Sequence, residues 1–176
     1  TKMISHQFCN SKITDISFSA QNQDIAFSHK NGNIEFLSIN NSETPFPLVQ
    51  ESGITNLEFS VDGKTLAFTQ ENGIIQICKQ DGSLLALGRH SNRIISMSLN
   101  FNNKNLATVG ADNSIKIWNF TNNKLSEIIF SPTHDSTINQ ICFNHNGEIL
   151  ASACDDCSIR LWNLNGKQIA VFRGHS

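Results

Sequence analysis

A repeat of about 40 residues is the strongest constraint on how this chain can fold. The segments ITDISFS, ITNLEFS, IISMSLN and INQICFN begin at Ile13, Ile54, Ile94 and Ile138, with spacings of 41, 40 and 44 residues. Each segment alternates apolar and polar residues, as a half-buried β-strand does. A turn, a second apolar strand, a second turn, a third strand and a less regular fourth strand follow each one. The repeat therefore predicts four antiparallel meanders of four strands each.

The repeated units predict an all-β array, because no segment has sustained helical periodicity. A single four-stranded sheet buries its faces poorly, whereas stacked sheets cover both faces, as in a propeller. Residues 1–9 look like the outer strand of a preceding unit, and residues 174–176 look like the start of a further one. We therefore expect either a piece of a longer array or closure against another copy. Within a single array over 1–176, we place the units at residues 10–50, 51–89, 90–133 and 134–173.

Composition favours a soluble globular protein. Hydrophobic residues make up 39% of the 176 residues and charged residues 16%, and no apolar run reaches the length of a membrane span. The net charge of −2 and the dispersed Lys and Arg residues predict no binding to nucleic acid or to a membrane surface. Five scattered cysteines fit free thiols in a cytoplasmic protein better than a disulfide framework.

Two stretches, residues 90–119 and 134–163, resemble repeats of the WD40 family. Each has, in order and at matching spacing, a His, a Ser or Thr in the second strand, an Asp in the second turn and a Trp in the third strand. The first two units are degenerate: Leu37 and Cys78 replace the Trp, and Asn31 and Asn72 replace the Asp. The resemblance covers essentially the whole chain. It implies WD40-type β-propeller blades, in a partial or open propeller because four units form only an arc.

The resemblance also implies a buried hydrogen-bond chain from the Trp indole through the hydroxyl and the imidazole to the Asp. Buried groups of these kinds need partners, so a closed network would pin each loop to its strands. We expect units one and two to be held mainly by apolar packing of Phe18, Phe27, Phe36, Phe59 and Phe68. The network residues expected in units three and four are His90, Thr108, Asp112 and Trp118, and His134, Ser152, Asp156 and Trp162.

The pair Cys154 and Cys157 is the strongest hint of metal or redox chemistry, but the hint is weak. Zinc needs three or four protein ligands, and Cys142 with His145 would have to complete the set. Those two residues are expected at the opposite end of the sheet, roughly 17 Å away for a strand of about five residues. A redox pair would need a helix N-terminus, and none is predicted. We therefore expect no metal and no cofactor.

His134, Ser152 and Asp156 also have the composition of a catalytic triad. The same three positions recur as His90, Thr108 and Asp112, and duplication at the repeat spacing indicates architecture rather than catalysis. The sequence contains no phosphate-binding loop, metalloprotease motif or nucleophile elbow. The chain is therefore not expected to be an enzyme. An enzyme or metalloprotein that uses the Cys pair is the less favoured alternative.

Strand parity predicts that the turns between second and third strands lie at the same end as the starts of the first strands. In WD40 proteins this rim is a common recognition surface. The resemblance assigns three candidate contact positions to each unit: the residue before the turn Asp, the residue after the first apolar residue of the inner strand, and the residue two positions earlier. They are Lys30, Thr14 and Lys12; Glu71, Thr55 and Gly53; Ala111, Ile95 and Arg93; and Asp155, Asn139 and Thr137.

The chemical variety of these positions favours a protein or peptide partner over a small metabolite. The sequence therefore predicts a non-catalytic scaffold for protein–protein interaction. The alternative is a sensor or regulatory region of a larger signalling protein whose ATPase, kinase or protease module lies elsewhere in the chain. In both cases the missing blades would come from the same longer chain or from another copy.

Overall fold

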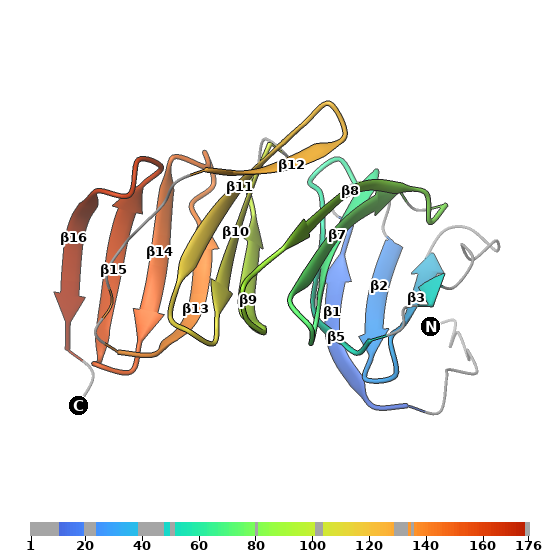
Figure 1. The fold of residues 1–176 in the computed structure, drawn as a ribbon, viewed down its shortest axis with the longest axis horizontal. Helices are drawn as coiled ribbons and strands as arrows, with labels where there is room; N and C mark the ends of the chain where they lie inside the picture. The colour runs from blue at the N-terminus through green and yellow to red at the C-terminus, as the bar shows by residue number, and fades with distance from the viewer. Residues whose placement is uncertain are drawn as a thin grey trace, which may run out of the picture.

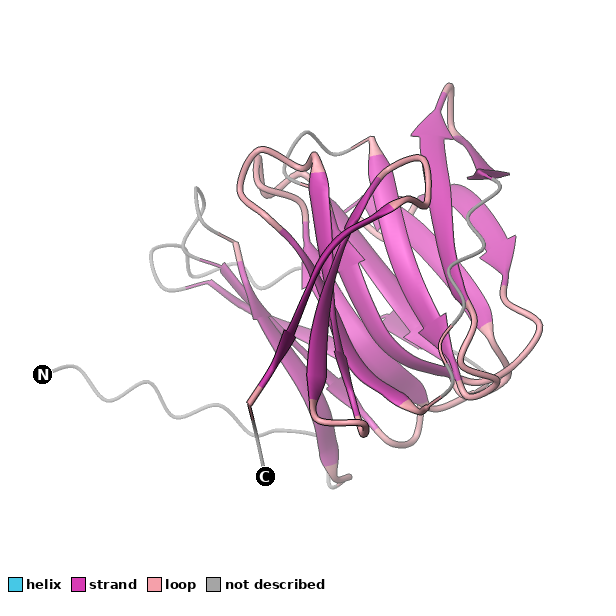
Figure 2. Ribbon diagram, turned by 90° about the vertical axis from the view of Figure 1, so that its left-hand side faces the viewer, coloured by secondary structure: helices cyan, strands magenta, loops and turns pink. Residues whose placement is uncertain are grey.

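The computed structural model is built from strands (Figure 1). It describes residues 11–19, 24–38, 48–49, 52–79, 81–100, 104–128, 134 and 136–174. These ranges contain sixteen strands. They contain no helix (Figure 2), and therefore no helix that could cross a membrane. The expected outer strand at residues 1–9 and most of the start of a further unit at 174–176 lie outside the described residues.

The strands form four sheets, which we call blades 1 to 4 in chain order. Each blade is a meander of four consecutive strands, and every pairing is antiparallel. Blade 1 comprises β1 (Ile13–Phe18), β2 (Asp24–His29), β3 (Asn33–Ser38) and β4 (Leu48–Val49). Blade 2 comprises β5 (Ile54–Phe59), β6 (Thr65–Gln70), β7 (Ile74–Lys79) and β8 (Leu84–Arg89).

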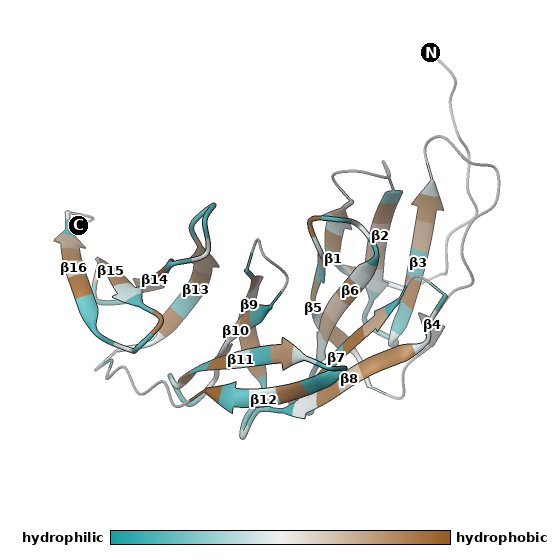
Figure 3. Cartoon of the chain, turned by 90° about the horizontal axis from the view of Figure 1, so that it is seen from above, coloured by the Kyte–Doolittle hydropathy of each residue, from teal (hydrophilic) through white to brown (hydrophobic). Residues whose placement is uncertain are grey.

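The second half of the chain repeats this arrangement. Blade 3 comprises β9 (Ile94–Leu99), β10 (Asn105–Gly110), β11 (Ile115–Thr121) and β12 (Lys124–Ile128). Blade 4 comprises β13 (Ile138–Phe143), β14 (Ile149–Cys154), β15 (Ser158–Asn163) and β16 (Gln168–Arg173). The blades fan out as an arc with the first strand of each on its inner side, so the prediction of an all-β open propeller is confirmed (Figure 3).

Apolar side chains fill the space between neighbouring blades. Between blades 1 and 2, Ile34 and Phe36 meet Phe59, Leu66 and Phe68. The next two interfaces are built in the same way, and each contains the tryptophan of one blade. Removing this apolar surface from water is the main stabilisation of such an array, at roughly 25 cal/mol for each Å² buried.

Four of the five phenylalanines expected to hold blades 1 and 2 are buried. Phe27, Phe36, Phe59 and Phe68 are at most 6% exposed, whereas Phe18 is 63% exposed. The expectation for Phe18 is therefore wrong. It lies on β1, the first inner strand of the arc, and no preceding blade covers it in the described structure.

A seam of hydrogen bonds joins the inner strands of successive blades. An edge strand presents backbone N–H groups that its own sheet cannot satisfy. Here the side chain at the third or fifth position of one inner strand accepts a bond from a backbone N–H of the next inner strand. The pairs are Leu57 to Asp15 at 2.8 Å, Phe59 to Ser17 at 3.0 Å, Leu99 to Glu58 at 2.8 Å, Ile141 to Ser96 at 3.1 Å and Phe143 to Ser98 at 3.1 Å.

The two ends of the arc expose apolar side chains. Among the described residues, seven of the nine exposed large hydrophobic side chains lie on blades 1 and 4. Ile16 and Phe18 are on β1 of blade 1, and Ile159 and Phe172 are on β15 and β16 of blade 4. An exposed apolar sheet face of this kind favours association.

Candidate functional site

Each inner strand begins with a β-bulge. The pairing between the first and second strands of every blade skips one residue on the inner strand. A bulge inserts one extra residue into a strand and redirects its side chain. The bulged residues are Thr14, Thr55, Ile95 and Asn139, which are four of the twelve rim positions predicted from sequence.

A backbone hydrogen bond joins the other two predicted positions of each blade. In every case the residue after the second strand donates its N–H to the carbonyl oxygen of the residue before the inner strand. All three predicted positions of a blade therefore lie together at one end of its sheet. The four bonds are Lys30 to Lys12 at 2.8 Å, Glu71 to Gly53 at 2.9 Å, Ala111 to Arg93 at 2.8 Å and Asp155 to Thr137 at 2.9 Å.

The rim of blades 1 to 3 is hollowed by a cavity of about 450 Å³, which we call the rim hollow. Six of the twelve predicted positions line it, together with two isoleucines from the starts of β1 and β5. The lining residues are Lys12, Ile13, Thr14, Lys30, Ile54, Thr55, Glu71 and Arg93. The hollow thus combines three cationic side chains, one carboxylate, two hydroxyls and an apolar floor.

The other six predicted positions lie outside the hollow. Ala111, Thr137, Asn139 and Asp155 are exposed on blades 3 and 4, and Ile95 is half-buried. The Asn139 amide donates to the Asp155 carboxylate at 2.6 Å, so these two side chains restrain each other.

Gly53 has a structural role in addition to the one predicted. It is buried, and a Cβ atom there would lie 2.6 Å from the Lys30 carbonyl oxygen and 3.3 Å from the Glu71 side chain. Gly53 therefore remains a predicted contact position, with its backbone as the group that it can offer. Its missing side chain allows blades 1 and 2 to approach each other beside the rim hollow.

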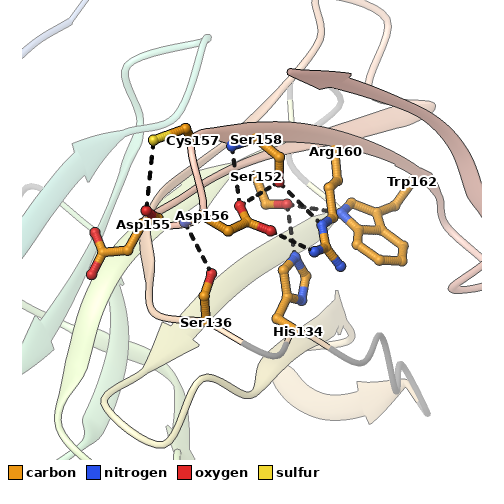
Figure 4. Close-up of polar contacts among 9 residues, drawn as sticks. All are labelled: His134, Ser136, Ser152, Asp155, Asp156, Cys157, Ser158, Arg160 and Trp162. Atoms are coloured by element: carbon orange, nitrogen blue, oxygen red, sulfur yellow. Dashed lines mark hydrogen bonds and ion pairs between the residues drawn. The ribbon is translucent and has the colours of Figure 1, made fainter. Parts of the chain in front are cut away.

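The polar network of blade 4 is centred on Ser152. The Trp162 indole N–H donates to the Ser152 hydroxyl at 2.9 Å, and the His134 Nε2 atom lies 3.0 Å from the same oxygen (Figure 4). The His134 and Trp162 rings also contact each other, with centroids 4.9 Å apart. The indole, the hydroxyl and the imidazole expected from sequence are therefore brought together.

The expected last link, from the imidazole to the aspartate, differs. The Asp156 carboxylate accepts hydrogen bonds from the Ser158 backbone at 3.0 Å and from the Arg160 guanidinium at 2.8 Å, rather than from His134 (Figure 4). Hydrogen bonds from Ser158 and Arg160 lower the pKa of Asp156 to about 2. Asp156 therefore ties the turn to β15.

Blade 3 has the same indole-to-hydroxyl link but a different histidine arrangement. Trp118 Nε1 donates to Thr108 Oγ1 at 2.9 Å. The His90 ring has its polar contacts with Ser91, the Asn92 backbone and Ser114, each at 3.5 Å, and within the described residues it has none with Thr108. Burial lowers the pKa of His90, although the nearby Asp112 opposes this shift. The buried imidazole is therefore favoured in its neutral form.

Comparison with known proteins supports the repeat architecture directly. The family model described as "WD domain, G-beta repeat" (WD40) matches residues 81–119 and 126–163. Each match begins near the outer strand of one blade and continues through three strands of the next. Blades 3 and 4 therefore contain WD40 repeats. WD40 propellers are generally non-catalytic scaffolds that bind protein partners.

A solved structure shows the same β-propeller fold. The β-propeller domain of Cps50 (Swd1) from Myceliophteria thermophila superimposes with a TM-score of 0.86 and 14% sequence identity. The match covers 98% of this chain and 59% of that one, so this chain spans about three fifths of that domain's length. A search of curated proteins gave no match.

The triad-like residues of the last WD40 repeat do not present a nucleophile. Ser152 is fully buried, and its hydroxyl oxygen accepts the Trp162 N–H. The carboxylate that a triad would place on the imidazole is bound to Ser158 and Arg160 instead. The network therefore acts as a connection between the loop and the strands of its WD40 blade.

The Cys pair of the same repeat lies on a tight turn. Cys154 ends β14, and Cys157 follows the turn with a φ of 62°, in the left-handed region. The equivalent turn positions in the other WD40 blades are Gly32, Gly73 and Asn113, all with positive φ. Among the described residues, no group of three or more side chains is arranged to hold a metal ion. Cys157 thus occupies a position that is defined by its backbone.

Sequence reasoning missed a second hollow, at the opposite end of the inner strands. This cavity of about 290 Å³ is lined by residues of blades 2 to 4, including Glu58, Ser98, Cys142 and His145. Burial, together with the nearby charge of Asp15, raises the pKa of Glu58 to about 7, although the hydrogen bond from Leu99 opposes the shift. The sequence contains one signal for this hollow. Glu58 is a carboxylate at the fifth position of its inner strand, where the other units have Ser17, Ser98 and Cys142.

Proposed function

We propose that this chain is a non-catalytic scaffold that presents the WD40 rim to protein or peptide partners. The supporting observation is the rim hollow, where side chains from three blades converge at the bulged ends of the inner strands. Bulges commonly redirect side chains next to functional sites. A hollow with charged, hydroxyl and apolar lining suits several side chains of a partner better than one small metabolite.

Site-specific photo-crosslinking in the native host tests this proposal. A photoreactive amino acid replaces Glu71, which is exposed in the rim hollow, and in a control it replaces Lys64, which is exposed at the other end of the same blade. We expect discrete crosslinked protein bands from position 71 and none of those bands from position 64. Identical bands from both positions, or crosslinks from position 64 alone, would contradict a role of the rim in partner binding.

A further inference from the structure

The folded chain gathers cationic side chains that are far apart in the sequence. Lys12 precedes β1, Lys30 follows β2 and Arg93 precedes β9, yet all three line the rim hollow. In the sequence these basic residues are dispersed. Lys12 and Lys30 belong to blade 1 and Arg93 to blade 3, and the stacking of the blades brings them together. Glu71 is the single carboxylate in the lining. The hollow therefore carries an excess of positive charge on a chain whose net charge is −2.

These three cations take no part in the ion pairs found among the described residues. The ion pairs among the described residues join His29 to Glu35, Lys116 to Glu127 and Arg160 to Asp156. None of them involves Lys12, Lys30 or Arg93, and all three side chains are exposed. Their charges are therefore available to a ligand.

The backbone that carries these side chains is already ordered. Lys30 donates its N–H to the Lys12 carbonyl at 2.8 Å, and the Arg93 carbonyl accepts the Ala111 N–H at 2.8 Å. The Arg93 N–H is itself bound to the Asn92 side chain at 2.9 Å. Binding at fixed backbone positions loses less conformational entropy than binding at a loop that must first be ordered.

We propose that the rim hollow binds an acidic segment of a protein partner, with carboxylates recognised by Lys12, Lys30 and Arg93; this inference rests on the proposed scaffold function. Arginine pairs with a carboxylate through two parallel hydrogen bonds, whereas lysine acts as a point charge. The half-exposed Ile13 suits an apolar side chain that lies beside the acidic ones.

The lining favours an acidic peptide over a nucleic acid. Glu71 lies within the hollow and Asp155 is exposed further along the rim, so a continuous phosphate backbone would meet repulsive charges. A cavity of about 450 Å³ accommodates a few side chains rather than a polynucleotide track. Oligonucleotide binding is therefore an outcome of the test and not part of the proposal.

The test is fluorescence anisotropy of the full-length protein with a labelled peptide of alternating Glu and Val. Its matched probes are the same peptide with Lys in place of Glu, and a labelled oligothymidine of similar length. The double variant Lys30→Glu with Arg93→Glu should weaken binding of the Glu peptide at least about tenfold, because like charges brought together cost several kcal/mol. Lys124→Glu, an exposed charge reversal on β12 outside the hollow, should leave the affinity unchanged. Added salt should weaken the binding of the Glu peptide.

Three results would overturn the proposal: equal affinity of the double variant and the wild type, tighter binding of the Lys peptide, or tighter binding of the oligothymidine. Circular dichroism of the variants shows whether they are folded. If the Glu peptide fails to bind while crosslinks at position 71 persist, the scaffold function stands and the acidic specificity is wrong. Loss of both signals would contradict both proposals.

Discussion

Ser152 illustrates how single hydroxyls organise the polar contacts of the tryptophans in the last two blades. Its oxygen has two partners, Trp162 and His134, whereas Thr108 in blade 3 has the Trp118 indole as its side-chain partner. A buried donor or acceptor that loses its partner keeps the full cost of desolvation. A substitution that leaves more buried groups without a partner should therefore cause a larger loss in the free energy of unfolding.

We predict that Ser152→Ala destabilises the protein more than Thr108→Val does. The first substitution leaves both an indole N–H and an imidazole nitrogen without this oxygen, at a cost of roughly 1–3 kcal/mol for each group. Thr108→Val leaves one group, the Trp118 indole N–H, without its acceptor. Urea denaturation of the two variants and the wild type measures the difference. Equal losses of stability would show that His134 contributes nothing through Ser152.

The left-handed backbone conformation of Cys157, rather than its thiol, lowers the stability of the protein. A non-glycine residue in the left-handed region costs roughly 1–2 kcal/mol, and glycine avoids this cost while losing more chain entropy. We therefore predict that Cys157→Gly raises the stability by roughly 0.5–1 kcal/mol. Cys157→Val should lower it, because a β-branched residue tolerates positive φ poorly. Thermal melting measures both, and a lower melting temperature for the glycine variant would contradict this account.

At the scale of the strands, the seam explains why β1, β5 and β9 have hydrogen-bond acceptors at their third or fifth positions. Ser17 and Ser98 accept N–H groups from the next blade, and Met97, beside Ser98, packs against the apolar core between blades 2 and 3. The same side chains therefore supply acceptors for the backbone N–H groups of an edge strand and set the register between blades.

Ser98→Ala tests this seam. Removing the hydroxyl leaves the Phe143 N–H at the junction of blades 3 and 4 without its acceptor, so we predict a loss of about 1 kcal/mol in the free energy of unfolding. Ser126→Ala, on an exposed stretch of β12, is the control and should change stability by less than about 0.5 kcal/mol. A Ser98→Ala variant as stable as this control would rule out a structural role for the bond.

Glu58 places an ionisable group in the seam between blades 2 and 3, close to Asp15 and beside the hollow that His145 lines. Its pKa is about 7 in the folded protein and 4.5 as its ordinary value, so the folded state holds the proton more tightly. Its contribution is therefore fully present below pH 4.5 and is lost as the pH rises through about 7.

We predict that Glu58→Gln removes this loss of stability with rising pH but keeps an acceptor for the Leu99 N–H. In the wild type the loss amounts to roughly 3 kcal/mol between the two pH limits. Denaturant midpoints at pH 5 and pH 8 should differ less in this variant than in the wild type. Glu148→Gln, at an exposed turn of blade 4, should retain the wild-type pH dependence. The same pH dependence in the wild type and in Glu58→Gln would contradict the burial of an ionisable seam residue.

The sequence predicts the local parts of this fold well. Alternating apolar residues locate the strands, and the resemblance to WD40 repeats places the twelve rim positions beside the turns and the starts of the inner strands. The exposure of Phe18, the role of Glu58 in the seam and the gathering of Lys12, Lys30 and Arg93 depend on how the sheets stack. A single sequence does not contain these distances, since Leu99 is 41 positions from Glu58 and Arg93 is 63 positions from Lys30.

At the scale of the whole molecule, the open arc leaves two apolar faces. Ile16 and Phe18 on blade 1 and Phe172 on blade 4 are more than half exposed. We predict that the 176-residue chain self-associates and binds an apolar dye, and that Phe18→Asp with Phe172→Asp reduces both signals. Analytical ultracentrifugation measures the association. A wild-type monomer that binds no dye would contradict the exposure of these faces.

The most direct test of the whole account is backbone hydrogen exchange of the seam amides, measured by NMR in the intact protein. If the four blades stack as one array, the N–H groups of Leu57, Phe59, Leu99, Ile141 and Phe143 are protected as strongly as those within the sheets, although their own sheets offer them no partner. Exchange of these five amides as fast as that of exposed turn residues would show that the blades do not stack.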